Sequence, residues 1–264
     1  MPTMKMTGAA RTWALVALQL ACVYSTVRAQ TPATAATPPT AEQLAAQRQQ
    51  AADLKFRNDW ANLERYRAAN SALPAPAAGE ARVVFMGNSI TDGWARHFAT
   101  MFPGKPYVGR GIGGQTTPQM LVRFRQDVVA LNPKVVVILA GTNDIAGNTG
   151  PSTLEMIEDN MMGMTEMAKA NGIRVVLSSV LPVFDYPWKP GLTPAPKIVA
   201  LNAWMKDYAA RVGAVYLDYF TPMADARQGL RADLTNDGVH PTEAGYRVMA
   251  PLADAAIAEA LRRP

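Results

Sequence analysis

Four short polar stretches of this 264-residue chain carry residue types that together could hydrolyse an ester. They are GNS (87–89), GRGIGGQTT (109–117), GTND (141–144) and DGVHPTEAGY (237–246). A serine hydroxyl is a weak nucleophile and needs an adjacent base. Ser89 is the candidate nucleophile, and His240, one of only two histidines in the chain, is the candidate base.

The spacing within the fourth stretch favours an acid–base pair. Asp237 precedes His240 by three residues, so its carboxylate can hold one imidazole nitrogen and leave the other free to take the serine proton. The tetrahedral intermediate then needs hydrogen-bond donors, each worth roughly 3–4 kcal/mol. A glycine-rich loop offers unobstructed backbone N–H groups, and Asn143 offers an amide. Together the stretches predict a serine hydrolase that uses no metal and no cofactor.

Taken singly, each stretch also has a purely structural interpretation. Ser89 and Asp237 could cap helices, and GIGG could be a turn, since it lacks the Gly-Lys-Ser/Thr end of a phosphate-binding loop. The chain has no G-x-S-x-G motif, which excludes the nucleophile elbow of the α/β-hydrolases. Two separated histidines, with no cysteine after Cys22, give no zinc-ligand cluster. We interpret His97 as a surface or rim residue and Asp144 as an acceptor that stabilises its loop.

The elements that must position these stretches alternate along the chain. Apolar, β-branched runs predict strands, and the amphipathic runs between them predict helices. We expect strands at 82–87, 107–109, 134–140, 173–180 and 214–217, and helices at 118–130, 152–170, 197–212 and 242–261. This alternation predicts a doubly wound parallel sheet, in which the carboxyl ends of all strands share one edge. The first three polar stretches should be neighbours there, and the fourth can reach the same edge through its loop.

In the order and content of these four blocks, residues 83–250 resemble the SGNH hydrolases, also called the GDSL esterase family. The resemblance implies a three-layer α/β/α sandwich around a five-stranded, flavodoxin-like parallel sheet. It assigns Ser89 as the nucleophile and an oxyanion N–H donor, Gly114 as the backbone donor, Asn143 as the side-chain donor, and Asp237 and His240 as the acid and the base of a triad. Asn88 stands where the family has Asp, which leaves the hydrogen bonding of that loop open. The motifs look most like those of platelet-activating-factor acetylhydrolase-like enzymes and bacterial acetyl esterases.

Residues 1–40 are predicted to lie outside the folded domain. Lys5 and Arg11 precede an apolar run, and Val-Arg-Ala precedes Gln30, which predicts a signal peptide at 1–29 and a secreted or periplasmic protein. The apolar run is too short to favour a membrane span. Cys22 offers a lipoprotein alternative, although Gln19 stands where an apolar residue is expected. Residues 30–40 predict a disordered Ala/Thr/Pro spacer, and residues 41–264 a single domain with an N-terminal helical extension at 41–70.

The charge of the chain gives no reason to expect a nucleic-acid partner. Three of the 26 basic residues and none of the 21 acidic residues lie in the predicted signal peptide, so the net charge of the remainder falls from +5 to +2. No basic run occurs elsewhere in the sequence. The expected partner is a small-molecule or polysaccharide ester, and the sequence leaves the oligomeric state open.

The loop PVFDYPWKPGLTP at 182–194 follows the fourth predicted strand and should lie near the same edge. Phe184, Tyr186 and Trp188 are candidate substrate contacts that could stack on a sugar or line an acyl pocket; alternatively, they pack on the rim of the domain. Export and the motif resemblance favour an esterase for small acyl groups, in particular acetyl esters of carbohydrates. A lysophospholipase-like lipid esterase or an aryl esterase is the alternative, and a non-catalytic glycan-binding module is a third interpretation.

Overall fold

The computed structural model describes residues 39–263, so the predicted signal peptide and most of the predicted spacer lie outside the described residues. The chain divides into two compact units after Leu44. The described part of the first unit contains only the beginning of helix α1 (Ala41–Asn58). None of the helices within residues 39–263 is long and apolar enough to cross a membrane.

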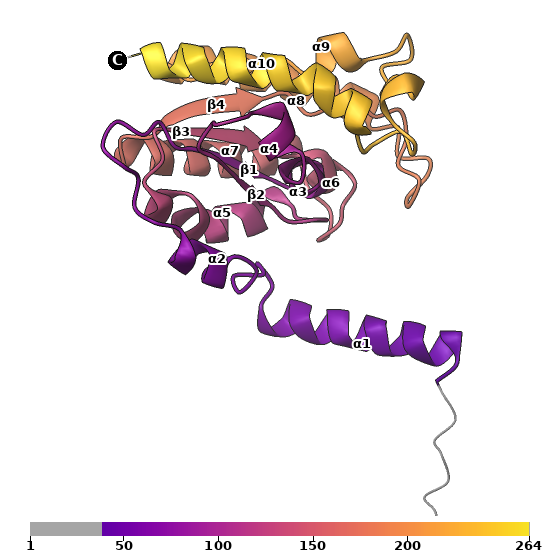
Figure 1. Ribbon diagram of the computed structural model, residues 1–264. Coiled ribbons are helices and arrows are strands. Elements are labelled where there is room, and N and C mark those ends of the chain that lie inside the picture. The colour runs from indigo at the N-terminus through magenta and orange to yellow at the C-terminus, as the bar shows by residue number, and fades with distance from the viewer. Residues whose placement is uncertain (1–38, 264) are drawn as a thin grey trace, which may run out of the picture. The chain divides into compact units, whose positions relative to one another are not determined.

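Five parallel strands form the centre of the second unit (Figure 1). In the order β2-β1-β3-β4-β5 they are β2 (Tyr107–Gly111), β1 (Val83–Gly87), β3 (Val135–Leu139), β4 (Arg174–Ser178) and β5 (Val215–Leu217). Their apolar, β-branched sequences suit a parallel sheet that is buried on both faces. The predicted doubly wound sheet is confirmed, and its strand order is that of flavodoxin-like folds.

Helices cover both faces of the sheet, and Figure 1 shows α10 on one side and α5 on the other. Val84 and Met86 join the apolar cluster of one face, whereas Val83 and Phe85 join that of the other, as the pleat of a strand requires. The first face is covered by α5 (Thr117–Asp127), α7 (Leu154–Ala170) and α8 (Ala195–Val212); the second is covered by α3 (Ser89–Ala95), α4 (Phe98–Met101), α9 (Phe220–Met223) and α10 (Glu243–Arg262).

The predicted long helices are present, with shifted ends. The helix expected at 118–130 is divided into α5 and a 3-10 turn at Val129–Leu131. A second 3-10 turn lies at Ala232–Leu234. Four short helices were not predicted: α3, α4, α6 (Thr142–Ile145) and α9. Two of them, α3 and α6, begin at the carboxyl ends of strands, where the polar stretches lie.

An N-terminal segment, residues 59–66, is held against α5 and the loop before it by three glutamine amides. The side-chain Nε2 of Gln115 donates to the carbonyl of Ala61 at 2.7 Å, that of Gln119 to Trp60 at 2.6 Å, and that of Gln126 to Leu63 at 2.7 Å. Helix α2 (Arg67–Ala72) follows this segment. The segment is therefore part of the second unit.

Candidate active site

Ser89 is the first residue of α3 and directly follows the end of β1. The Asn88 side chain accepts a hydrogen bond from the N–H of Ile90 at 3.2 Å, so an amide caps this helix where the family has a carboxylate. Gly111 lets α3 approach β2 closely, because a Cβ at this position would lie 2.1 Å from the backbone nitrogen of Asp92. The N–H of Ser89 donates to no acceptor in the described part of the chain, as is typical of the first residue of a helix, and is therefore available to a ligand.

The structure brings Ser89, His240 and Asp237 into one hydrogen-bonded chain. Ser89 Oγ lies 2.8 Å from His240 Nε2, and His240 Nδ1 lies 2.7 Å from Asp237 Oδ2. The other carboxylate oxygen of Asp237 accepts the backbone N–H groups of Val239 at 2.9 Å and His240 at 2.8 Å. Thr235 donates its hydroxyl to the carbonyl of His240 at 2.8 Å. The loop is therefore folded around the carboxylate, which fixes the orientation of the imidazole.

The surroundings of Asp237 keep its carboxyl group ionised. Burial alone would raise its pKa, but hydrogen bonds from the backbone and ring of His240 and from the N–H of Val239 outweigh burial and lower the pKa to about 2. At neutral pH the carboxylate can therefore hold the Nδ1–H of His240. The opposite nitrogen, Nε2, is then free to accept the proton of Ser89.

Gln115 links Gly114 to Asn143: it directly follows Gly114 in the chain, and its carbonyl accepts a hydrogen bond from the Asn143 side chain. Gly114 has a φ of +76°, and its N–H donates to no acceptor within residues 39–263. Asn143, which is 3% exposed, donates one amide hydrogen to the carbonyl of Gln115 at 2.8 Å, which leaves its second hydrogen available. A Cβ at Gly113 would lie 3.8 Å from the Cβ of Ser89, so this loop passes directly beside the serine.

Arg123, which the sequence analysis did not single out, joins the loop to the strand that carries Ser89. Its side chain is fully buried. It donates Nε to Gln115 Oε1 at 2.6 Å, Nη2 to the carbonyl of Gly87 at 2.9 Å and Nη1 to Asp127 Oδ2 at 3.0 Å. No local pattern distinguishes this residue from a solvated helix arginine, because its three partners come together only in the folded chain.

Asp144 has the role predicted for it as a loop acceptor. Its Oδ1 accepts the backbone N–H of Thr117 at 2.9 Å and the hydroxyl of Thr117 at 2.6 Å, which ties the GTND stretch to the beginning of α5. Burial raises the pKa of this carboxyl to about 6, although the hydrogen bonds from Thr117 oppose the shift.

The three predicted aromatic contacts have different surroundings. Trp188 is 45% exposed, and its ring centroid lies 6.1 Å from that of His240, at the edge of the site. Phe184 is exposed and lies under the guanidinium of Arg227, with Arg227 Cζ 4.6 Å from the ring centroid. Tyr186 is a correction to the prediction, because it is fully buried and its hydroxyl donates to the carbonyl of Thr142 at 2.9 Å. Tyr186 holds the GTND stretch from the interior of the domain, and its buried ring cannot contact a substrate directly.

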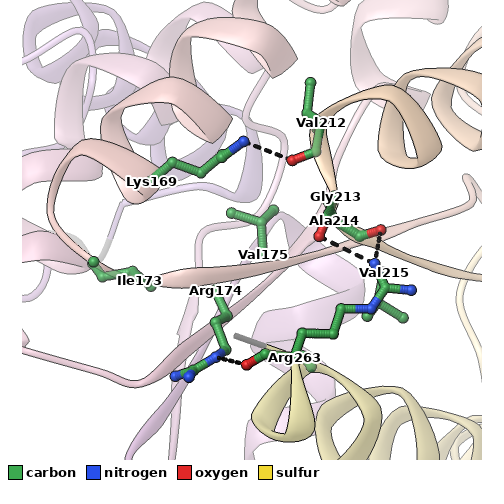
Figure 2. A pocket seen from close by; sticks show the side chains of 11 residues that line it. Lys169, Ile173, Arg174, Val175, Val212, Gly213, Ala214, Val215 and Arg263 are labelled. Carbon is green, nitrogen blue, oxygen red and sulfur yellow. Dashed lines mark hydrogen bonds between the residues drawn. The ribbon is translucent and has the colours of Figure 1, made fainter.

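A hollow of about 310 Å³ lies at the opposite, amino-terminal end of the strands (Figure 2). Figure 2 shows that its cationic side chains point at backbone carbonyls: Lys169 Nζ lies 2.6 Å from the oxygen of Val212, and Arg263 Nη1 lies 2.7 Å from that of Ala214. None of the candidate site residues lines it. Among residues 39–263, no group of three or more His, Cys, Asp or Glu side chains could hold a metal ion.

Comparison with known proteins is consistent with this arrangement. Residues 85–248 match the model of the GDSL-like lipase/acylhydrolase family. The solved structure of a candidate acylhydrolase from Bacteroides fragilis is 48% identical and covers 77% of this chain and 99% of its own, with a TM-score of 0.75. A GDSL-like lipase from Bacteroides thetaiotaomicron is 46% identical, with coverages of 76% and 100% and a TM-score of 0.74.

A curated acetylxylan esterase from Xylanibacter ruminicola is 26% identical in an alignment 224 positions long that covers 70% of this chain. The chain spans less than half the length of the curated relatives it matches, at 32% of one and 45% of this esterase.

Proposed function

Because the chain belongs to the GDSL-like lipase/acylhydrolase family, we propose that it is a serine esterase with Ser89, His240 and Asp237 as its catalytic triad. The observation that carries this proposal is the unbroken hydrogen-bonded chain from Ser89 Oγ through the His240 ring to Asp237, with distances of 2.8 and 2.7 Å. This is the geometry that activation of a serine hydroxyl requires.

In the proposed reaction, Ser89 Oγ attacks the ester carbonyl while His240 Nε2 accepts its proton. The oxyanion receives hydrogen bonds from the N–H groups of Ser89 and Gly114 and from the side-chain amide of Asn143. His240 then returns the proton to the departing alcohol, which leaves Ser89 acylated. Water, activated by the same imidazole, attacks the acyl-enzyme and releases the acid.

We assign acetyl esters of carbohydrates as the substrate class, and a site outside the cytoplasm as the place of action. The acetylxylan esterase relative and the exposed Trp188 ring beside His240 support the substrate. The assignment to export depends on residues 1–29, which lie outside the described residues. A lipid or aryl esterase is the competing assignment.

The Ser89→Ala variant tests the nucleophile. We expect it to fold normally and to lose nearly all hydrolysis of p-nitrophenyl acetate, while Ser71→Ala, at an exposed position on α2, keeps the wild-type rate. A sulfonyl fluoride should sulfonylate Ser89 Oγ in the wild type with loss of HF, which mass spectrometry detects, and should not modify the alanine variant at this position. Wild-type turnover by Ser89→Ala would overturn the proposal.

A separate measurement tests the acyl group and the alcohol. The wild type should hydrolyse p-nitrophenyl acetate faster than the butyrate, hexanoate and decanoate, and should release acetate from acetylated xylan. A rate that increases with chain length, without acetate release from xylan, would favour the lipid esterase. Binding of glycans without any ester hydrolysis would favour a non-catalytic module.

A further inference from the structure

A cavity of about 410 Å³ lies between the N-terminal segment and the candidate oxyanion loop. Its lining includes Phe56, Asp59, Trp60, Gly113, Gly114 and Asn148, and we call it the Trp60 pocket. It shares Gly113 and Gly114 with the active site, but one of its walls precedes residue 85, where the family match begins. Its volume falls within the range of small-molecule sites, roughly 300–1,000 Å³.

The wall that carries Trp60 is fixed in place. The carbonyl of Trp60 accepts the Gln119 amide at 2.6 Å, and the carbonyl of Ala61 accepts the Gln115 amide at 2.7 Å. The Asp59 carboxylate accepts the N–H of Leu63 at 2.7 Å, which closes the turn. These contacts use the carbonyls of Trp60 and Ala61 and the side chain of Asp59, so the indole lies at the pocket without itself forming the attachment.

The lining combines open aromatic surface with unsatisfied polar groups. Trp60 is 36% exposed and Phe56 49% exposed, so both rings leave apolar surface open at the pocket. Asn148 donates its amide to the carbonyl of Gly114 at 3.2 Å, and its Oδ1 accepts no hydrogen bond from residues 39–263. Asn62, also in the lining, has a buried Oδ1 with no hydrogen-bond partner among residues 39–263. A pyranose ring presents C–H groups on its face and hydroxyls on its rim, so a flat aromatic ring beside these two amide oxygens is complementary to it.

We propose that the Trp60 pocket is a subsite for a sugar unit of the substrate, next to the unit that carries the acetyl ester at Ser89. The proposal rests on the esterase function proposed above and adds that the enzyme recognises an oligosaccharide rather than a single sugar. A long acyl chain would occupy the pocket less well, because the amide oxygen of Asn148 would lose hydration without gaining a hydrogen-bond donor.

The experiment measures kcat/KM on acetylated xylo-oligosaccharides of one to four units, with p-nitrophenyl acetate as the reference ester. In the wild type we expect kcat/KM to rise by about tenfold, or about 1.4 kcal/mol, as the sugar chain lengthens. Trp60→Ala should abolish the rise, and Trp60→Phe, which keeps an aromatic face, should preserve most of it. Trp204→Ala, on α8 and away from the pocket lining, is the matched control and should show the wild-type rise.

A binding measurement separates failure of this inference from failure of the proposed esterase. In the Ser89→Ala background, calorimetry should detect binding of unacetylated xylotetraose, and the added Trp60→Ala change should weaken it about tenfold. No dependence on sugar chain length in the wild type, or equal dependence in Trp60→Ala, would overturn the subsite even if ester hydrolysis is intact. Selective loss of p-nitrophenyl hexanoate hydrolysis in Trp60→Ala would instead make the pocket an acyl site.

Discussion

Replacement of Arg123 by Met should destabilise the fold far more than any other loss of a basic side chain on α5. The arginine is 0% exposed, and its carboxylate partner Asp127 is 1% exposed. Removal of one partner of a buried pair leaves the other charge without its counter-ion, which typically costs about 3–5 kcal/mol. The carbonyl of Gly87 and the side chain of Gln115 lose their donors at the same time. The Asp127 carboxylate keeps one donor, the side-chain amide of Asn70 at 2.7 Å. We therefore expect a loss of stability in the lower half of this range, about 3–4 kcal/mol.

For a domain of this size, a loss of about 3–4 kcal/mol corresponds to a fall in Tm of about 6–16 °C. Urea denaturation, followed by circular dichroism at pH 7, gives the free energy of unfolding directly if the m-value is unchanged. Arg125→Met is the matched control, because Arg125 is exposed on the same helix and its loss should cost no more than about 0.5 kcal/mol.

A second variant separates the charge from the packing. In Arg123→Met combined with Asp127→Leu neither member of the buried pair is left without the other, so most of the lost stability should return. If Arg123→Met differs from Arg125→Met by less than about 1 kcal/mol, the buried-pair reasoning is wrong. If the double variant is no more stable than Arg123→Met, the cost comes from the lost contacts to Gly87 and Gln115 instead.

Three further substitutions test the site. Asn143→Ala should lower kcat by on the order of 10²–10³ with little change in KM; a raised KM with normal kcat would make Asn143 a substrate-binding group. Asp237→Asn should lower kcat by on the order of 10⁴, since the amide can stabilise the wrong tautomer of His240; a loss below about tenfold would remove Asp237 from the triad. Asp144 keeps its proton to about pH 6 when folded but only to about pH 3.9 when unfolded, so its contribution to stability falls as pH rises from about 4 to 6. Urea denaturation at pH 4, 5, 6 and 7 should show the free energy of unfolding of Asp144→Asn rising by about 2 kcal/mol relative to the wild type across this range, and a constant difference would contradict a raised pKa for Asp144.

The sheet and the positions of the chemical groups were predictable because their signals are local. A parallel strand buried on both faces is a continuous apolar run, and the run expected at 134–140 is strand β3 (Val135–Leu139) with one residue trimmed at each end. The polar residues that follow such runs must lie at the carboxyl edge of the sheet. Ser89 and Asn143 were therefore expected at the same edge of the sheet. In the structure His240 also lies there, at hydrogen-bond distance from Ser89.

The groups that support the site were not predictable, because their partners are distant in sequence. Gln115 binds a carbonyl 54 residues earlier, and Arg123 binds one 36 residues earlier. Tyr186 was misassigned for a related reason. A tyrosine in a proline-rich loop is typical of an exposed rim, and only the folded chain brings its hydroxyl to Thr142. Polar side chains that bind backbone carbonyls leave no periodicity to detect.

The three glutamine contacts to residues 60–63 limit how far the N-terminus of a recombinant fragment can be shortened. A recombinant fragment that starts at residue 85, where the family match begins, would already lack the first residues of β1. It would also strip the carbonyl partners from the amides of Gln115, Gln119 and Gln126. Each of these hydrogen bonds contributes about 0.5–1.5 kcal/mol net, and the carbonyl of Gln115 accepts the amide of Asn143. The shortest fragment that retains these contacts therefore begins no later than Asp59, whose carboxylate closes the turn that presents the three carbonyls.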